Sequence, residues 1–159
     1  MCGLCGELRF DGSLPDLAAL ARMSAQLARR GPDHAGSYSD GSLAFGHRRL
    51  SIIDLSPSAN QPMVDAALQL ALVFNGTIYN YRELRTELVE LGYTFFSEGD
   101  SEVILKAYHA WGERCVERFY GMFAFAVWDQ RVRQLFLARD RFGIKPLYLA
   151  QSSEWLRFA

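Results

Sequence analysis

Runs of apolar and alternating residues predict a chain rich in β-strands. The stretch 69–75 is apolar almost without interruption, which is typical of a strand covered on both faces. Turn sequences such as Asp11-Gly12 and Asp40-Gly41 separate several of the other runs. The predicted strands are 3–11, 35–39, 43–46, 69–75, 122–129, 134–140, 147–150 and 155–159.

Apolar residues at helical spacing predict three helices. The first follows Ser13 or Asp16, either of which can cap it, and its apolar face contains Leu17, Leu20, Ala21, Leu27 and Ala28. Gly31 is expected to be its C-terminal cap, because Pro32 prevents continuation. The second helix, with Tyr81, Leu84, Leu88 and Leu91, ends before Gly92, and the third, with Val103, Ile104, Ala107, Tyr108 and Trp111, ends before Gly112.

Helices on both sides of these apolar strands favour sheets that are covered by helices. We therefore expect an α+β fold, a four-layer α-β-β-α sandwich of mainly antiparallel sheets. The run 155–159 stops within its predicted strand, which suggests a fragment of a longer protein.

The composition is that of one globular domain. The chain has 159 residues, of which half are hydrophobic, and its net charge of −1 gives no electrostatic reason to expect nucleic acid or an anionic membrane as a partner. No apolar run approaches the roughly 20 residues of a membrane span, and no secretory signal is visible, so a cytoplasmic location is expected. The three cysteines, Cys2, Cys5 and Cys115, are interpreted as reduced thiols.

Cys2 follows the initiator methionine, and removal of Met1 would leave a thiol and a free α-amino group on one residue. Their ordinary pKa values, about 8.5 and about 7.7 to 8.0, allow the amine to accept the thiol proton near neutral pH. Many chains begin with Met-Cys by chance, so this pair of residues is weak evidence by itself.

Two further polar pairs lie on or next to predicted strands. Arg48 and Arg49 would point to opposite faces of a strand, so that one could face inward, although the pattern alone favours two solvated surface charges. Asn75-Gly76 could offer a side-chain amide and a backbone N–H together, but the same dipeptide also favours a simple turn. Asp100 could similarly be only the N-cap of the third helix.

Taken together, these segments resemble the glutaminase domain of class II, N-terminal nucleophile glutamine amidotransferases, and most closely that of glutamine-hydrolysing asparagine synthetases. The matching segments occur in the order of the family: Met1-Cys2-Gly3, Arg30-Gly31-Pro32-Asp33, Gly46-His47-Arg48-Arg49-Leu50-Ser51-Ile52-Ile53-Asp54, Gln61-Pro62-Met63, Phe74-Asn75-Gly76-Thr77-Ile78-Tyr79-Asn80, Asp100-Ser101-Glu102-Val103, Gly121-Met122-Phe123-Ala124-Phe125, Arg139-Asp140 and Gly143-Ile144-Lys145-Pro146-Leu147-Tyr148.

The resemblance implies an enzyme that hydrolyses L-glutamine to glutamate and ammonia through a thioester on Cys2. It implies that Asn75 and Gly76 form the oxyanion hole. It also implies that Arg49 binds the α-carboxylate of glutamine and Asp100 its α-ammonium group. The other residues expected to line the substrate site are Leu50, Ser51, Ile52, Ile53 and Thr77.

The resemblance further implies that residues 1–159 are a glutaminase domain whose partner is its own C-terminal, ATP-dependent synthetase domain, with a homodimer left open. We expect no metal and no cofactor in this domain, because the chain contains neither Ser-Gly-Gly nor a Gly-Lys-Ser/Thr phosphate loop. ATP and magnesium are expected only for the synthetase domain.

The acceptor carboxylate is expected to be N-acetylglutaminylglutamine or aspartate. Segments around Cys5 and Cys115 resemble bacterial N-acetylglutaminylglutamine amidotransferases in particular.

One departure from the family is Thr77, where an acidic residue is usual. It motivates an alternative, a catalytically degenerate domain with a structural or regulatory role. Two other functional interpretations fit the sequence less well. Cys2-Gly3-Leu4-Cys5 has the spacing of a redox motif, but it precedes a strand rather than a helix. A zinc site lacks paired ligand spacing among the cysteines and histidines.

Overall fold

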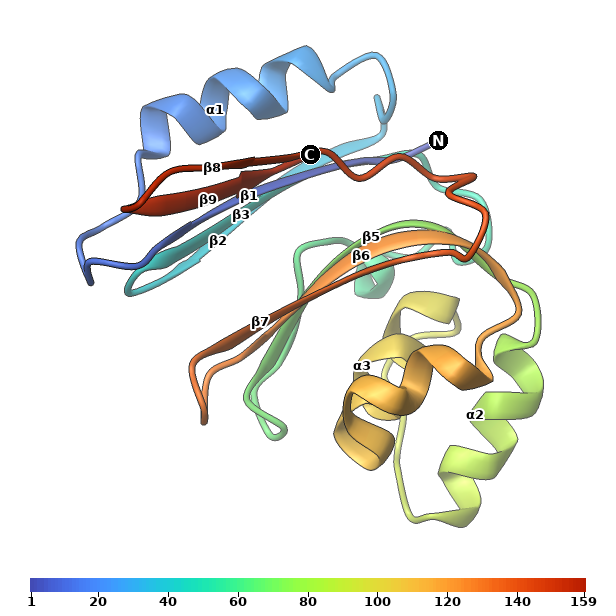
Figure 1. Cartoon of the computed structure of the whole chain (residues 1–159). Coiled ribbons are helices and arrows are strands. Elements are labelled where there is room, and N and C mark those ends of the chain that lie inside the picture. The colour runs from blue at the N-terminus through green and yellow to red at the C-terminus, as the bar shows by residue number, and fades with distance from the viewer.

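Two antiparallel β-sheets are stacked face to face in the computed structural model, which describes all residues from 1 to 159 (Figure 1). The first sheet contains, in spatial order, β2 (His34–Asp40), β3 (Leu43–Arg49), β1 (Gly3–Arg9), β9 (Trp155–Phe158) and β8 (Leu149–Gln151). The second contains β4 (Met63–Asp65), β5 (Leu70–Ile78), β6 (Gly121–Asp129) and β7 (Gln134–Arg139). All strand pairs are antiparallel.

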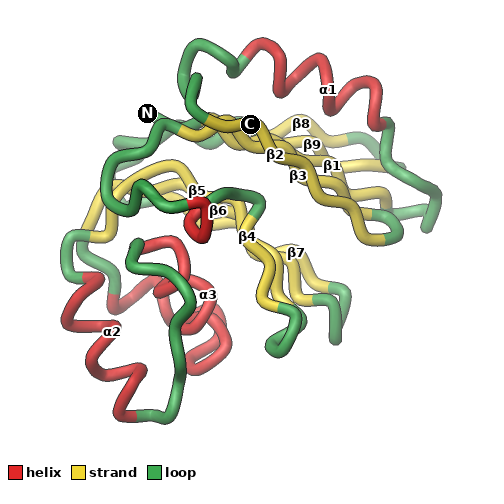
Figure 2. The backbone as a smooth tube through the Cα atoms, turned by 180° about the vertical axis from the view of Figure 1, so that it is seen from behind, coloured by secondary structure: helices red, strands yellow, loops and turns green.

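The helices cover the two outer faces of the stack. Helix α1 (Leu17–Gln26) lies on the first sheet, whereas α2 (Tyr81–Glu90) and α3 (Asp100–Trp111) lie on the second (Figure 2). Short 3₁₀ segments occupy Pro57–Ala59 and Gly112–Arg118. This arrangement confirms the expected α+β, four-layer α-β-β-α sandwich.

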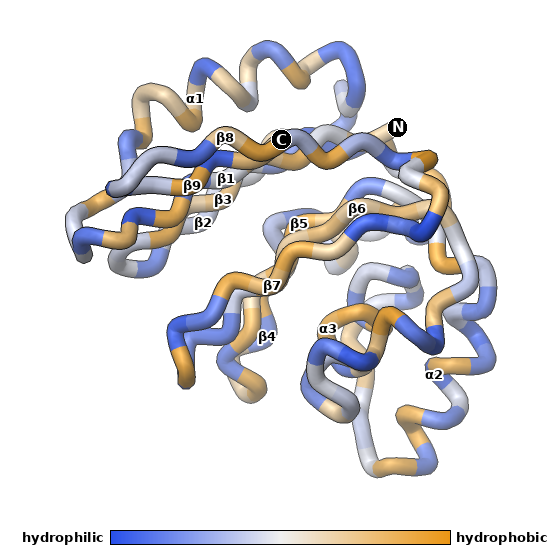
Figure 3. Tube along the Cα trace, viewed as in Figure 1, coloured by the Kyte–Doolittle hydropathy of each residue, from blue (hydrophilic) through white to orange (hydrophobic).

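Three apolar clusters hold the four layers together, and Figure 3 shows hydrophobic residues along the strands and on α3. The largest cluster, with 17 buried residues, joins the second sheet to α2 and α3. Nine residues, among them Phe45, Trp128 and Phe158, fill the space between the sheets. Only Cys5, Leu20 and Ala44 are fully buried between the first sheet and α1. The cluster between the first sheet and α1 is therefore the smallest of the three.

Several boundaries differ from the sequence predictions for identifiable reasons. Helix α1 is capped by Asp16, whose Oδ1 accepts the N–H of Ala19 at 2.8 Å, and it ends at Gln26, before the expected stop. Gly31 is not its C-terminal cap. A Cβ at this position would lie 2.6 Å from the carbonyl carbon of Arg49, so glycine allows the chain to pass close to β3.

The structure decides two alternatives that the sequence left open. Asn75-Gly76 does not form a turn, because β5 continues to Ile78 and pairs with β6 over its whole length. Asp100 is the first residue of α3 and Gly99 is its N-cap. The side chain of Asp100 is therefore available for a role other than capping.

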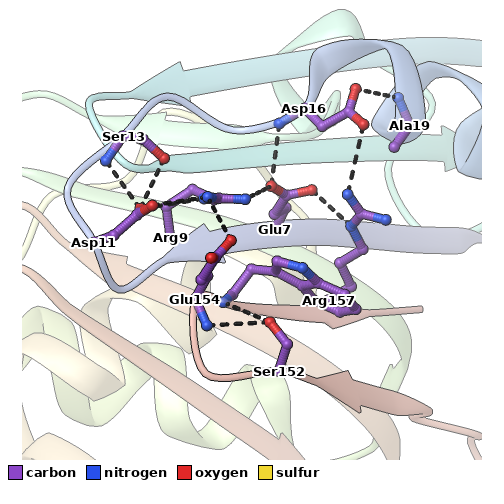
Figure 4. A network of polar contacts seen from close by, with 10 residues as sticks. Glu7, Arg9, Asp11, Ser13, Asp16, Ala19, Ser152, Glu154 and Arg157 are labelled. Atoms are coloured by element: carbon purple, nitrogen blue, oxygen red, sulfur yellow. Dashed lines mark hydrogen bonds and ion pairs between the residues drawn. The ribbon is translucent and has the colours of Figure 1, made fainter.

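A buried carboxylate, Glu7, connects β1 to the start of α1 and to β9 (Figure 4). Its Oε2 accepts the Nε–H of Arg157 at 2.7 Å, and its Oε1 accepts the backbone N–H of Asp16 at 3.1 Å. Glu7 is only 1% exposed, whereas Glu154 at the edge of the same network is exposed. Glu7 therefore fixes the position of α1 on the sheet.

Replacing Glu7 by alanine should lower the free energy of unfolding by about 2 to 3 kcal/mol, because the backbone N–H of Asp16 and the guanidinium of Arg157 lose their buried acceptor. Urea denaturation followed by circular dichroism measures the change. Glu154→Ala is the matched control, and it should change stability by less than about 0.5 kcal/mol because its ion pair with Arg9 is exposed. Equal effects of the two substitutions would contradict this assignment.

Candidate active site

Polar residues of β5 face the space between the two sheets at one end of the stack. Ala71 and Val73 belong to the apolar cluster between the sheets. Side chains two residues apart on a strand share a face, so Asn75 and Thr77 point into the same space. The buried layer between the sheets therefore changes from apolar to polar along this strand.

The first sheet shows the same change at the same end. Phe45 of β3 lies in the cluster between the sheets, and His47 and Arg49 follow it at alternate positions. Leu4 of β1 lies in that cluster too, so the alternate position before it belongs to Cys2. Figure 1 shows the start of the chain and the loops after β3 and β7 gathered at this end.

A cavity of about 110 Å³ opens where these polar residues meet. Most residues that the sequence predicts for the site line it: Cys2, Arg49, Leu50, Ile52, Ile53, Asn75, Gly76, Thr77 and Asp100. Ser51 does not line the cavity, and its backbone N–H instead donates to Asp33 Oδ2 at 2.8 Å. Met1, Asp54, Gln61, Met122 and Lys145 also line it.

Cys2 immediately precedes β1, and its thiol contacts two backbone atoms of Leu50. The backbone N–H of Leu50 donates to Sγ at 3.4 Å, and Sγ lies 3.6 Å from the carbonyl oxygen of the same residue. The Nε–H of Arg30 donates to the carbonyl oxygen of Cys2 at 3.0 Å. The sulfur therefore packs against the backbone of Leu50.

The backbone N–H of Gly76 lies on the edge of β5 that β4 leaves unpaired beyond Leu72. Its two neighbours on this edge have side-chain partners. Phe74 N–H donates to Gln61 Oε1 at 2.6 Å, and Ile78 N–H donates to Asp100 Oδ2 at 3.0 Å. The N–H of Gly76, between them, faces the cavity that Gly76 lines.

Arg49 is 6% exposed and forms no ion pair in the chain. Its Nη1 donates to Ser56 O at 2.9 Å and to Asn60 Oδ1 at 2.7 Å, and its Nη2 donates to Asp54 O. All three acceptors are neutral, and two of the five guanidinium N–H groups remain. Arg49 therefore shapes the loop after β3 and keeps a buried positive charge that a carboxylate could neutralise.

Asp100 is the negative counterpart across the cavity. It is 5% exposed, its Oδ2 accepts the N–H of Ile78, and no cation contacts it. Burial raises the pKa of this carboxyl from 3.8 to about 6. Besides Lys145, the cavity thus contains a buried cation, Arg49, and a buried anion, Asp100, neither of which is paired within the protein.

His47 is buried beside the site, and no role was predicted for it from the sequence. The side chain is fully buried, and its Nε2–H donates to the carbonyl oxygen of Phe74, next to Asn75, at 3.0 Å. Burial lowers the pKa of His47 to about 4, so the ring is neutral at pH 7. His47 therefore links the two sheets directly beside the predicted oxyanion donors.

The pKa values of His47 and Asp100 predict opposite effects of pH on stability. His47 binds a proton less readily in the folded state, so its contribution is present above pH 6.5 and is lost as the pH falls to about 4. Asp100 binds a proton more readily in the folded state, so its burial becomes less costly as the pH falls from about 6 to 3.8. Each contribution is about 3 kcal/mol. The two therefore nearly cancel.

The wild-type free energy of unfolding should accordingly change little between pH 6.5 and 4. Asp100→Asn, which keeps an acceptor for Ile78 N–H, should be more stable than wild type at pH 7 by as much as about 3 kcal/mol and should lose that amount as the pH falls to 4. Urea denaturation at several pH values tests this. Parallel pH profiles for the two proteins would contradict it.

The thiols are not arranged as a redox pair. Cys5 packs against α1, on the opposite face of β1 from Leu4 and Cys2, as expected for residues three apart on a strand. All three cysteines are free, and burial raises the pKa of Cys5 to about 11 and that of Cys115 to about 12. No group of three or more His, Cys, Asp or Glu side chains is placed to hold a metal ion, and no helix is long and apolar enough to cross a membrane.

Comparison with known proteins decides the family. A model of the glutamine amidotransferase domain matches residues 1–159, the whole chain. The chain belongs to the glutamine amidotransferase domain family. The family expected from the ordered motifs is thus confirmed.

Curated relatives of this glutamine amidotransferase domain carry names of asparagine synthetases. A relative from Mycobacterium tuberculosis, provisionally named a glutamine-hydrolysing asparagine synthetase, is 48% identical over 92% of this chain and 25% of its own length. Glutamine-hydrolysing asparagine synthetases 1 and 3 of Bacillus subtilis are 42% and 38% identical over 100% and 98% of this chain, and over 26% of each relative. The domain spans about a quarter of the length of these relatives.

A solved structure shares the fold of this glutamine amidotransferase domain. Glutamine phosphoribosylpyrophosphate amidotransferase from B. subtilis aligns over 99% of this chain and 41% of its own, with a TM-score of 0.77 and 18% sequence identity. At that identity the likeness concerns the fold alone. It confirms the N-terminal nucleophile type of sandwich that the resemblance implied.

Proposed function

We propose that this domain hydrolyses L-glutamine to glutamate and ammonia through a thioester on Cys2, once Met1 has been removed. The observation that carries the proposal is the pair of unpaired buried charges around the Cys2 cavity. Free glutamine carries one α-carboxylate and one α-ammonium group. Arg49 and Asp100 match these two charges, and an unpaired buried charge gains most from a ligand of opposite sign.

The first chemical step is attack on the side-chain amide of glutamine. The thiol proton moves to the α-amino group of Cys2, directly or through water, and sulfur forms a bond to the amide carbon. The resulting oxyanion would accept hydrogen bonds from the Asn75 amide and the Gly76 N–H. Both donors lie in one buried strand, so little reorganisation is needed during the reaction.

The second half of the reaction releases both products. The α-ammonium of Cys2 returns its proton to the departing nitrogen, the carbon–nitrogen bond breaks and ammonia leaves. Water, deprotonated by the same amine, then attacks the thioester, and the sulfur leaves to regenerate the thiol with glutamate as product. Each proton taken by the α-amino group is thereby returned, and no metal or ATP takes part.

Thr77 affects how tightly glutamine is held. It lines the cavity with a neutral hydroxyl, and Asp54, the other carboxylate there, is already the acceptor for the N–H groups of Ser56 and Glu98. Asp100 would therefore provide the charge for the α-ammonium group. As the pKa of Asp100 is about 6 when the cavity is empty, KM for glutamine should rise as the pH falls below that value.

We extend the proposal to a longer protein, since the curated relatives are about four times as long as this chain. In it, an ATP-dependent synthetase domain would use the ammonia to amidate a carboxylate, that of N-acetylglutaminylglutamine or of aspartate, in the cytoplasm. The 159-residue domain would need neither ATP nor magnesium for glutamine hydrolysis. The names of the relatives support this extension.

The test is labelling of the processed chain, with Cys2 as its first residue, by the glutamine analogue 6-diazo-5-oxo-L-norleucine. Intact and peptide mass spectrometry should find one adduct, on Cys2, and glutamine should block it. Cys5 and Cys115 serve as internal controls, because burial and raised pKa values make both thiols unreactive; fragment ions distinguish Cys5 from Cys2 within their common peptide. An enzymatic assay of glutamate should show turnover without ATP.

A processed chain whose Cys2 stays unlabelled, with no glutamate formed, would contradict the proposal. That result would favour the degenerate domain, for which the neutral Thr77 is the motivating observation. A chain that retains Met1 is the matched inactive control, because its α-amino group belongs to the wrong residue.

A further inference from the structure

Lys145 is a buried cation at the cavity with no anionic partner. It is 4% exposed, and its Nζ lies 2.9 Å from the Sδ of Met1 and in no ion pair. A thioether is a weak, neutral acceptor. The acceptor of this ammonium group is thus the Met1 sulfur, an atom that leaves the protein when Met1 is removed.

The loop that carries Lys145 is fastened firmly. The carboxylate of Asp140 accepts four backbone N–H groups, those of Phe123, Phe142, Ile144 and Lys145, at 2.9 to 3.2 Å. Phe123 belongs to β6, so the loop after β7 is attached to the second sheet. These bonds fix the backbone of Lys145 and direct its side chain toward the start of the chain.

Covalent geometry places this ammonium close to the nucleophile. The five bonds between Met1 Sδ and the backbone nitrogen of Cys2 span at most roughly 6 Å. After processing, that nitrogen is the α-amino group. Nζ of Lys145 then lies within roughly 9 Å of that amine and has lost its acceptor, and its flexible side chain can approach further.

The other charged groups around Cys2 are already engaged or assigned. Arg30 donates to the carbonyl oxygen of Cys2, and Arg49 donates to the loop after β3. Asp54 accepts two backbone N–H groups of its own surroundings, and Asp100 accepts that of Ile78. Lys145 is therefore the charge at the cavity that remains without an explanation.

We propose that Lys145 is a positioning residue that tunes the Cys2 nucleophile after Met1 is removed. Its positive charge stabilises the thiolate and disfavours a second positive charge on the α-amino group. The first effect makes the thiol easier to deprotonate, and the second keeps the amine unprotonated, and therefore able to accept a proton, near neutral pH. This inference rests on the proposed function for its role in turnover, but its effect on the thiol can be measured without glutamine.

The experiment compares the processed wild-type chain with the processed Lys145→Met and Lys145→Arg variants. The rate of Cys2 alkylation by iodoacetamide is measured from pH 5.5 to 9.5 by peptide mass spectrometry. Removing an opposite charge close to a thiolate raises its pKa by about one unit or more. We expect Lys145→Met to be alkylated about 10-fold more slowly at pH 6.5 and at the wild-type rate at the alkaline plateau. Lys145→Arg should restore most of the rate.

Arg141→Met is the matched control, since it removes an exposed positive charge from the same loop and does not line the cavity. It should leave the alkylation profile unchanged. A Lys145→Met profile that coincides with wild type would overturn the inference, as would a change confined to KM for glutamine. If the alkylation profile shifts while the wild-type chain forms no glutamate, the proposed function fails and the effect of Lys145 on the thiol stands.

Discussion

Replacing Asn75 by alanine should lower kcat for glutamine hydrolysis by about 100- to 1,000-fold, with little change in KM. The side-chain amide would serve the oxyanion, which forms only after attack, and not the charged groups of the bound substrate. Alanine fits the site, because Ala71 and Val73 already occupy the same face of β5. Steady-state kinetics of glutamate release measure both constants.

The control for Asn75 is another amide at the opposite end of β6. Gln130 donates to the hydroxyl of Tyr38 at 2.6 Å and does not line the cavity. Gln130→Ala should keep kcat within about twofold, as an amide outside the site affects stability only. If Asn75→Ala instead raised KM and left kcat intact, the amide would bind the substrate and not the oxyanion.

Asp100→Asn should lower kcat/KM for glutamine by about 100-fold, because the α-ammonium group loses a buried charge partner, an interaction that is commonly worth 2 to 5 kcal/mol. The asparagine can still accept the N–H of Ile78, so the fold at this point is kept. The decisive comparison is with glutaramate, which is glutamine without its α-amino group. The substitution should reduce the preference for glutamine over glutaramate by the same factor.

Two outcomes separate recognition from misfolding in this variant. The expected gain in stability of Asp100→Asn at pH 7 would show that lost activity does not come from unfolding. Kinetics with glutaramate should be nearly unchanged. An equal loss with both substrates would contradict the assignment of Asp100 to the ammonium group and would place it in the chemistry or in the shape of the site.

Much of the fold follows from local patterns in the sequence. The hairpin of β6 and β7 and the three helices appear where apolar spacing and turn residues predict them. The ends of helices and strands that depend on tertiary contacts differ from the predicted ends. Gly31 is needed because β3 passes close by, and Asn75-Gly76 stays extended because β6 pairs with it; neither partner strand is visible from the local sequence.

The candidate site was predictable to the extent that its residues lie in ordered motifs. The strand pattern alone does not tell which of two adjacent arginines faces inward, whereas the family resemblance implied Arg49. The structure decides it, because Arg48 donates to Ser24 of α1 while Arg49 lines the cavity. Lys145 was assigned no role, because a charged residue between Gly143 and Pro146 has the pattern of a solvated loop. It is buried only because the loop folds back over the start of the chain.

The alternation of faces along β5 limits which insertions and deletions this domain can tolerate. One residue added between Ala71 and Asn75 would exchange the two faces of the strand from that point. Phe74, now packed toward α2 and α3, would project among the polar groups, and Asn75 would enter the apolar layer beneath the helices. Across related sequences, changes of length should therefore fall either in the turns that join the strands or, within the strand, in steps of two.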